Sequence, residues 1–302
     1  MASSYEVFER PAPTSRQECT RLDHPVRGRQ YPRNVLRENS PVGDRSRQVS
    51  VVKRDGTATR RVADFVATED PLEIRLNDVP LAVVMRTPGD DEDLVTGFLL
   101  TEGILLDPGE LQAVERIDES RVSVRLQDGV AVDPTRFQRN LFMSSSCGVC
   151  GKASIEAVQL FARPAREFTI ERATIAELTT RLRSQQPTFD ETGGLHAAGI
   201  FNLVGELLAV REDVGRHNAV DKAIGVVAKR QWPLEPSILV VSGRQSFEIV
   251  QKAAVVGIGG VVGVSAPSSL AVELAETLGM LLVGFSREDA FNVYAGEARL
   301  VH

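Results

Sequence analysis

The sequence predicts an α/β fold in which a sheet that contains parallel strands has helices on its faces. The evidence is an alternation of strand and helix patterns in the last third of the chain. Continuous apolar strands are expected at residues 237–244, 261–265 and 280–285. Two helices are expected between these strands, at residues 247–256 and 268–278, where apolar residues recur at helical spacing. Aliphatic strands joined through helices are typical of a parallel sheet whose faces are both covered.

A smaller α+β domain is expected over residues 48–138. Apolar residues alternate over residues 49–65 on both sides of a turn at Asp55 and Gly56, which is the period of a strand pair. Further along, apolar residues at one-turn spacing predict a short amphipathic helix that stops at Gly103. More alternating stretches follow this helix, so strands on both sides of one helix indicate an α+β unit.

The N-terminal segment, residues 1–47, has a different composition. It is rich in Arg, Pro and Ser and has few aliphatic clusters, so it buries too little surface to offset the entropy of ordering. We therefore expect a disordered tail, and we interpret Cys19 within it as incidental. Residues 139–302 then form the α/β domain, which includes the loop with the other two cysteines.

Composition narrows the class of protein. The 302 residues carry a formal net charge of −6, so the chain lacks the net positive charge that would favour nucleic acid as a partner. Residues 1–10 do not resemble a secretory signal, and no apolar run is long enough to span a bilayer. Three cysteines are too few for a disulfide scaffold of this size. These observations predict a cytoplasmic protein with no membrane partner.

Two cysteines form a C-x-x-C motif, Cys147 and Cys150, flanked by Gly148 and Gly151. A helix is expected directly after the motif, and a thiol at a helix N-terminus is stabilised as the nucleophilic thiolate. The motif fits a zinc half-site, a redox pair or a persulfide carrier. Zinc needs further ligands, and the chain has no second C-x-x-C and no H-x-x-x-H, so no metal site is expected. The other two roles stay open on this evidence.

Polar residues follow each predicted parallel strand, where ligands of open parallel sheets bind. Helix N-termini at the same edge favour anions, and arginine pairs phosphates in bidentate fashion. The alternative explanation is that strand ends are polar because they leave the core. The residues at the first and third strand ends are Ser242, Gly243 and Arg244, and Phe285, Ser286 and Arg287.

Two histidines are further candidates. His196 lies among small residues, which suggests close backbone packing and a structural role as much as a functional one. A helix that started at Asp213 would place Asp213, His217 and Asp221 on one face at i, i+4 spacing. A capped amphipathic helix explains part of this pattern, but so many polar groups in one turn and a half favour a ligand-facing role for His217.

Five segments together resemble the FdhD family, the formate dehydrogenase accessory sulfurtransferases. The resemblance runs from about Val49 to the C-terminus and does not cover the tail. The most specific segment is the one around His217. The five segments are residues 147–151, 196–199, 212–222, 241–244 and 285–294.

The resemblance implies a sulfurtransferase with a cysteine persulfide intermediate. Such a protein takes sulfur from a cysteine desulfurase and transfers it to the bis-molybdopterin guanine dinucleotide cofactor of formate dehydrogenase. Cys147 would then be the persulfide carrier and Cys150 the second thiol. The resemblance also implies a homodimer and a C-terminal domain that is similar to cytidine deaminases. Deaminase activity is not expected, since His196 is not followed by the required glutamate.

The family's cofactor-binding segment agrees with the strand-end reasoning, and GDP should serve as a mimic of the cofactor. Two alternatives remain: a non-enzymatic chaperone that shelters a guanine-nucleotide cofactor, and a C-x-x-C thiol–disulfide oxidoreductase. The predicted cofactor-binding residues are Phe285, Ser286, Arg287, Glu288, Asp289 and Ala290, joined by Ser242, Gly243, Arg244 and His217.

Overall fold

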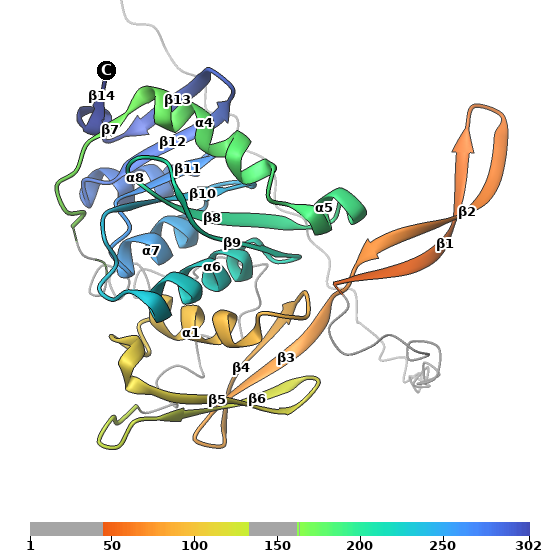
Figure 1. Cartoon of the computed structure of the whole chain (residues 1–302), viewed down its shortest axis with the longest axis horizontal. Helices are drawn as coiled ribbons and strands as arrows, with labels where there is room; N and C mark the ends of the chain where they lie inside the picture. Colours follow the sequence, from red (N-terminus) through yellow and green to blue (C-terminus); the bar gives the residue numbers. More distant parts are fainter. Residues whose placement is uncertain (1–44, 133–161, 163) are drawn as a thin grey trace, which may run out of the picture. The chain divides into compact units, whose positions relative to one another are not determined.

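A computed structural model describes residues 45–132, 162 and 164–302, which belong to one compact unit. Its centre is a six-stranded sheet in the order β13-β12-β11-β10-β8-β9 (Figure 1). The three middle strands β10, β11 and β12 are parallel, which confirms the predicted α/β fold. Antiparallel strands extend both edges, a feature the sequence patterns did not predict. The strands are β8 (His196–Asn202), β9 (Leu207–Asp213), β10 (Ser237–Val241), β11 (Gly260–Gly263), β12 (Leu281–Arg287) and β13 (Ala290–Ala295).

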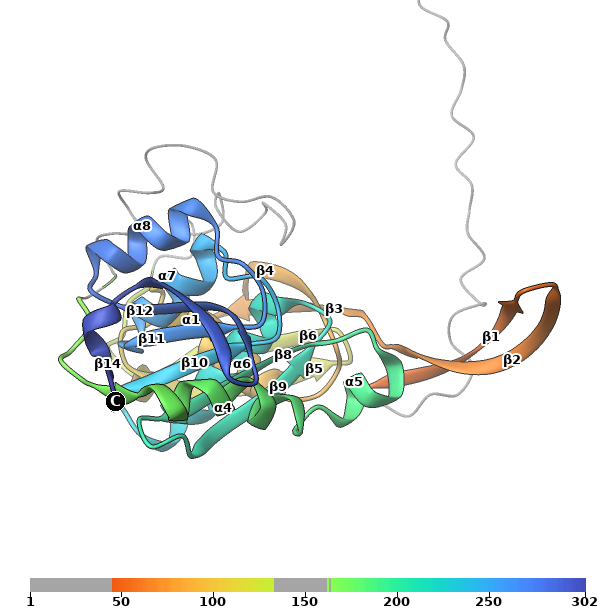
Figure 2. The same cartoon turned by 90° about the horizontal axis from the view of Figure 1, so that it is seen from above.

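Helices cover both faces of this sheet (Figure 2). α4 (Arg172–Arg183) packs on one face, and α6 (Arg216–Arg230), α7 (Phe247–Val255) and α8 (Ser269–Thr277) pack on the other. Ser268 caps α8 by accepting a hydrogen bond from the Ala271 amide. No helix among the described residues is long and apolar enough to cross a membrane.

A second, four-stranded sheet has the order β4-β3-β6-β5 and packs against α1 (Asp91–Thr101). Its strands alternate buried and exposed residues because only one face meets the core. A 3₁₀ turn at Pro108–Glu110 leads into β5. The strands are β3 (Asp70–Leu76), β4 (Val79–Arg86), β5 (Leu111–Asp118) and β6 (Arg121–Leu126).

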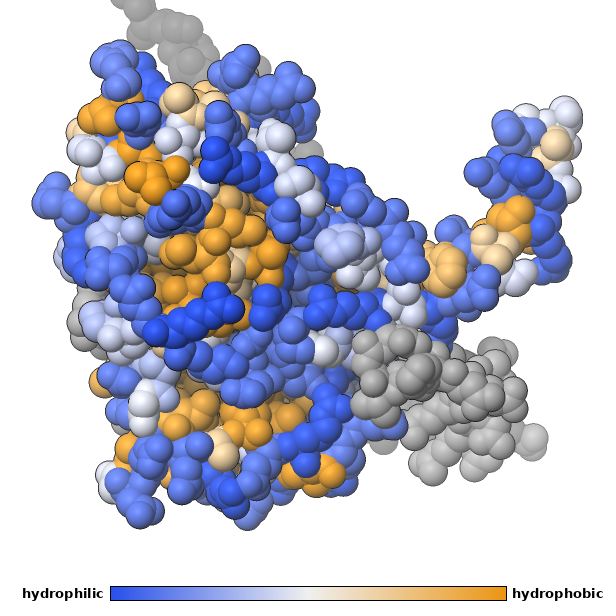
Figure 3. Space-filling model, in the orientation of Figure 1, coloured by the Kyte–Doolittle hydropathy of each residue, from blue (hydrophilic) through white to orange (hydrophobic). Residues whose placement is uncertain are grey.

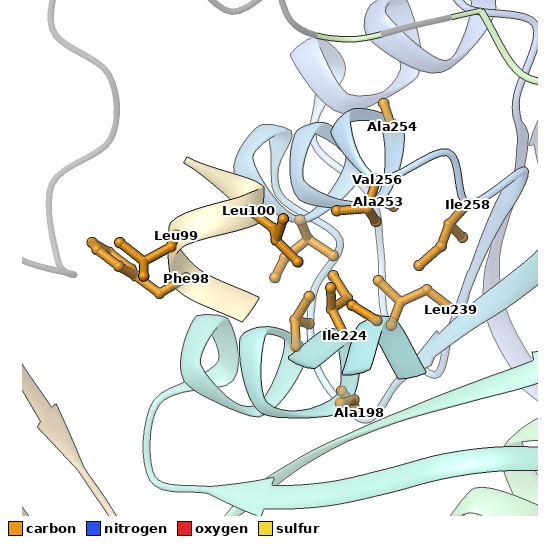
Figure 4. Packing of buried hydrophobic residues seen from close by; sticks show 14 of the residues in the cluster. Phe98, Leu99, Leu100, Ala198, Ile224, Leu239, Ala253, Ala254, Val256 and Ile258 are labelled. Atoms are coloured by element: carbon orange, nitrogen blue, oxygen red, sulfur yellow. The ribbon is translucent and has the colours of Figure 1, made fainter. Parts of the chain in front are cut away.

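The helices α1 and α6 cross very closely, and glycines make this possible. A Cβ atom at Gly97 would lie 1.8 Å from the backbone oxygen of Asp221, and one at Gly225 would lie 2.0 Å from that of Asp93. The apolar core is continuous from the small sheet through α1 to the large sheet. Figure 4 shows the part of this core that lies between α1, α6 and α7. The predicted domain boundary after residue 138 lies outside the described residues.

The remaining strands form two small sheets. β1 (Ser46–Asp55) and β2 (Ala58–Ala67) make a hairpin around the predicted Asp55-Gly56 turn, where Gly56 has a φ of 57°. β1 thus begins two residues before residue 48, at which the small domain was predicted to start. β7 (Ile170–Glu171) pairs with β14 (Leu300–Val301), which follows a 3₁₀ turn at Glu297–Arg299. α5 (Pro187–Thr192) lies between α4 and β8 along the chain.

Candidate functional site

A cavity of about 700 Å³ lies beside the carboxyl ends of β11 and β12. The end of α4 and the residue Asp190 of α5 form its other wall. All the lining residues except Val264 carry a hydroxyl or a charged group, and both signs of charge are present. The lining residues are Thr179, Thr180, Arg183, Ser184, Asp190, Val264, Ser286, Arg287 and Glu288.

The end of β12 is irregular where it meets this cavity. Its pairing with β13 shifts between Gly284 and Arg287, which indicates a bulge. Phe285 and Glu288 have φ values of 52° and 48°, in the left-handed region that non-glycine residues rarely adopt. Gly284 has no room for a side chain, since a Cβ atom would lie 3.0 Å from the Ser265 carbonyl oxygen. Strain of this kind is concentrated at functional sites in proteins.

The bulge orients neighbouring side chains differently. Phe285 is 44% exposed, whereas Ser286 is fully buried. The Ser286 hydroxyl lies 3.4 Å from that of Thr179, which also donates to the Ser286 carbonyl oxygen at 3.3 Å. These contacts join the strand end to α4 at the cavity, whereas Phe285 is not one of the residues that line it.

The two arginines at the cavity differ in whether they form an ion pair. Arg183 and Asp190 form an ion pair of 2.5 Å in which both side chains are about half exposed. Arg287 is exposed and makes no ion pair or side-chain hydrogen bond with the part of the chain that the structure describes. A guanidinium in this state is available to a phosphate or carboxylate of a ligand.

The end of β10 contacts a different group of residues. The Ser242 hydroxyl accepts a hydrogen bond from the Ala197 amide at 2.8 Å. Gly243 faces His196, because a Cβ atom there would lie 3.3 Å from His196 Nδ1. Arg244, the next residue, is exposed. Burial, followed by the charge of Arg216, lowers the pKa of His196.

His217 lies near the beginnings of α6 and α7. Its Nε2 atom is 3.5 Å from the Ser246 hydroxyl and 4.0 Å from Glu248 Oε2. Burial, followed by the positive charges of Lys252 and Arg216, lowers the pKa of His217 to about 4. The imidazole is therefore neutral at pH 7. A neutral imidazole can accept a proton or a hydrogen bond from a ligand.

The predicted helix from Asp213 is wrong in its starting point. α6 begins at Arg216, whereas Asp213 ends β9, where it pairs with His196. Asp213 also accepts a hydrogen bond from the Gly215 amide at 2.8 Å, which turns the chain before the helix starts. It forms a fully buried ion pair of 2.8 Å with Lys222. Asp213 and His217 therefore do not share a helix face.

Asp221 belongs to a second buried network. It accepts hydrogen bonds from Thr101 at 2.7 Å and from Lys252 at 3.0 Å, and Lys252 also pairs with Glu102 at 2.7 Å. Burial raises the pKa of Asp221 to about 6, while the Lys252 charge opposes the rise. This network joins α1, α6 and α7, so its role is structural.

The predicted site residues thus divide between the two faces of the large sheet. Ser286, Arg287 and Glu288 line the cavity on the α4 side, and Gly243 and His217 lie on the side of α6 and α7. Asp289 lies in the turn between β12 and β13, and Ala290 begins β13 and pairs with Arg287. Cys147 and Cys150, together with the helix expected after them, lie outside the described residues.

The contribution of α4 to the cavity was not predicted from the sequence. Thr180, Arg183 and Ser184 are exposed as in an ordinary amphipathic helix, and Thr179 is buried on the side that faces the sheet. No local signal distinguishes them. Only the packing of α4 across the ends of β11 and β12 brings them to the cavity.

Comparisons with known proteins agree with this architecture. The sequence pattern of the FdhD/NarQ family matches residues 67–301. The sulfur carrier protein FdhD of Streptomyces avermitilis is 49% identical over 261 residues, covering 82% of this chain and 92% of that protein. That of Sulfolobus acidocaldarius is 44% identical over 238 residues, covering 78% and 91%.

A solved structure is also similar. It is described as that of a formate dehydrogenase accessory protein from Desulfotalea psychrophila, and it aligns with a TM-score of 0.70 at 27% sequence identity. The alignment covers 85% of this chain and all of the other. Sequence and fold therefore agree over the same part of the molecule, and the chain belongs to the FdhD/NarQ family.

Proposed function

We propose that this protein is a sulfur carrier that accepts persulfide sulfur from a cysteine desulfurase and delivers it to bis-molybdopterin guanine dinucleotide for formate dehydrogenase. The name of the relatives, sulfur carrier protein FdhD, supports the carrier role. The desulfurase, the cofactor and the homodimer are parts of the proposal that the family resemblance suggests. The proposal places the activity in the cytoplasm, where the desulfurase and the client would meet the carrier.

Cys147 carries the sulfur in this proposal. Its thiolate attacks the outer sulfur of the desulfurase persulfide, the S–S bond of that persulfide breaks, and the desulfurase thiolate leaves. The product is a persulfide on Cys147, so the exchange needs no outside oxidant or reductant. Cys150 is the second thiol of the same loop.

The cavity beside β12 is the observation that supports a nucleotide client. Its volume of about 700 Å³ falls in the range of small-molecule sites. Arg287 lines the cavity and supplies a cation for a diphosphate. Phe285 is exposed at the same strand end, but it is not one of the residues that line the cavity. Asp190 and Glu288 offer carboxylates as acceptors for the N–H groups of guanine. The cavity thus carries a cation for the diphosphate and carboxylates for the base of a guanine nucleotide.

Sulfur loading tests the proposal directly. The protein is incubated with a cysteine desulfurase and cysteine, and the peptides are analysed by mass spectrometry under non-reducing conditions. We expect an added sulfur atom on the Cys147 peptide, and none after Cys147→Ala. Cys19→Ala is the matched control and should load normally. Full loading of Cys147→Ala would remove Cys147 from the carrier role.

Sulfur loading, GDP binding and insulin reduction, measured together, separate the two alternatives. A chaperone that only shelters the cofactor would bind GDP without acquiring sulfur on any cysteine. A thiol–disulfide oxidoreductase would reduce insulin disulfides, with no dependence on added GDP. Sulfur on Cys147 together with GDP binding and no insulin reduction is the result that our proposal requires.

A further inference from the structure

The first turn of α6 carries an arginine that has no polar partner among the described residues. Arg216 makes no ion pair and no side-chain hydrogen bond with them, and its Nε atom is buried. Buried polar atoms of folded proteins almost always have a hydrogen-bond partner, and the loss of that partner is costly. Because the Arg216 side chain is partly exposed, a ligand from solvent can reach it and supply the missing acceptor.

Two imidazoles lie beside this guanidinium. Burial is the main reason why the pKa values of His196 and His217 are low, and the positive charge of Arg216 lowers both further. His196 begins β8, where a Cβ atom at Gly243 would lie 3.3 Å from its Nδ1 atom, and His217 follows Arg216 in α6. We call His196, Arg216 and His217 the Arg216 cluster. It lies at the edge of the large sheet at which β9 and β10 end (Figure 1).

The start of α6 adds backbone donors to the Arg216 cluster. Its N-cap residue is Gly215, so no capping side chain accepts hydrogen bonds from the first amides of the helix. α8 differs, because Ser268 caps its first turn. A Cβ atom at Gly215 would lie 2.8 Å from Asn218 Nδ2, so this position has no room for a capping side chain. Amide groups at a helix N-terminus favour an anion.

The chemical character of the Arg216 cluster favours a small polar ligand. Figure 3 shows apolar patches between hydrophilic residues on the face that it depicts, and exposed patches of this kind suit protein partners. The Arg216 cluster has the opposite character, since guanidinium and imidazole groups both donate hydrogen bonds. Its three side chains are all partly exposed. Hydrogen-bond donors and one positive charge, within reach of solvent, fit an anion.

An acidic residue borders the cluster near His217. Glu248 Oε2 lies 4.0 Å from His217 Nε2. Burial opposes the ionisation of Glu248, but hydrogen bonds from the Ser246 hydroxyl and from its own amide, together with the charge of Arg216, hold its pKa below the usual value. The carboxylate is therefore charged at neutral pH. It repels an anion bound at Arg216, so its removal should strengthen binding.

We propose that the Arg216 cluster binds a small tetrahedral oxyanion, in a second site on the α6 side of the large sheet. Arg216 supplies the charge, the first turn of α6 supplies amide donors, and the imidazoles donate further hydrogen bonds. Two groups share this chemistry, a phosphate and the oxo-metal end of a molybdenum cofactor. The inference goes beyond the proposed sulfur transfer and does not depend on it.

Isothermal titration calorimetry of the full-length protein with sodium molybdate and with sodium phosphate at pH 7.5 tests the site. Arg216→Gln should weaken anion binding roughly tenfold or more. Arg172→Gln, which changes an exposed arginine of α4, is the control and should bind as the wild type does. Glu248→Gln should strengthen binding roughly two- to fivefold, because it removes a nearby negative charge. A damaged fold could not produce this last change, so the two variants together separate an effect of charge from a loss of stability.

The preferred anion identifies the source of the ligand. Tighter binding of molybdate assigns the site to an oxo-metal group, and tighter binding of phosphate assigns it to a phosphate group. Both outcomes support the site, whereas a wild-type protein that binds neither anion would remove it.

Two further measurements locate the anion. Saturating GDP should leave the affinity for the preferred anion unchanged, whereas displacement by GDP would place the anion in the cavity beside Arg287. The chain has four histidines, and in NMR spectra of histidine-labelled protein the anion should shift the resonances of His196 and His217 but not that of His302. Displacement by GDP, equal affinity of Arg216→Gln and the wild type, or unchanged resonances of His196 and His217 would overturn the proposal.

Discussion

At the scale of single residues, the end of β12 shows how backbone geometry prepares a binding group. The bulge buries Ser286 against α4 and leaves its neighbours Phe285 and Arg287 exposed. Side chains alternate in the same way along a regular strand. The positive φ values at Phe285 and Glu288 show, in addition, that the backbone of this strand end has an energetically unfavourable conformation. The hydrogen bonds to Thr179 supply part of the compensation.

Arg287→Ala should weaken GDP binding by about 1–3 kcal/mol, the scale of a charged hydrogen bond, which corresponds to roughly tenfold to a hundredfold in Kd. Isothermal titration calorimetry measures the effect. Arg172→Ala removes an exposed arginine from the opposite end of α4 and should bind GDP as the wild type does. Equal affinities for the two variants would move the phosphate site away from β12.

His217 should make folding sensitive to acid. Its pKa is about 4 in the folded state, compared with 6.5 in the unfolded chain, so the unfolded state binds more protons between these values. The stabilisation is fully present above pH 6.5 and is lost as the pH falls towards 4, to a total of about 3 kcal/mol at most. Urea unfolding from pH 7.5 to 4.5 should show a smaller loss for His217→Gln, and equal losses would contradict the assignment.

At the scale of elements, the crossing of α1 and α6 depends on two glycines. Gly97→Ala would drive a methyl group into the Asp221 backbone, which cannot move as a flexible side chain could. We expect a loss of about 1–3 kcal/mol or more in the free energy of unfolding, as for other overpacked cores. Gly225→Ala should behave alike, because it meets the Asp93 backbone. Denaturant unfolding measures both, and wild-type stability of either variant would show that the helices can separate.

At the scale of the whole molecule, a ligand that binds only the folded state should stabilise all of it. GDP at 100 times its Kd should add about 2.7 kcal/mol to the free energy of unfolding. Thermal unfolding with GDP, and with ADP as the matched control, should show an upward shift for GDP that exceeds the shift for ADP. Equal shifts would mean that the cavity recognises the diphosphate and not the guanine base.

The sequence predicted the parts of the fold that local patterns encode. Aliphatic runs identified β10, β11 and β12, and the Asp55-Gly56 turn located the first hairpin. The antiparallel edge strands β9 and β13 were missed because pairing partners are set by tertiary packing. The start of α6 was misplaced because Asp213 is an acceptable cap residue by type, and only its pairing with His196 shows that it ends a strand.

The candidate site was predictable only in part. Ser286 and Arg287 could be found because strand ends of a parallel sheet meet at one edge. Thr179 and Arg183 could not, since their helix carries an ordinary amphipathic pattern. From the sequence alone, a lysine such as Lys252 is expected at the surface. In the structure it is buried in an ion pair with Asp221. The sequence could not predict this pairing, because it arises only when the helices pack.

The end of β10 has a consequence for how this chain can vary in length. Leu239 and Val241 of β10 pack with core residues of α6 and α7, whereas Ile238 and Val240 pack with core residues of α4. Because successive residues of a strand point to opposite faces, inserting one residue into β10 would exchange the two faces for the residues beyond the insertion. Inserting two would restore them. Inserting an odd number of residues into β10 should therefore destabilise the fold more than inserting an even number.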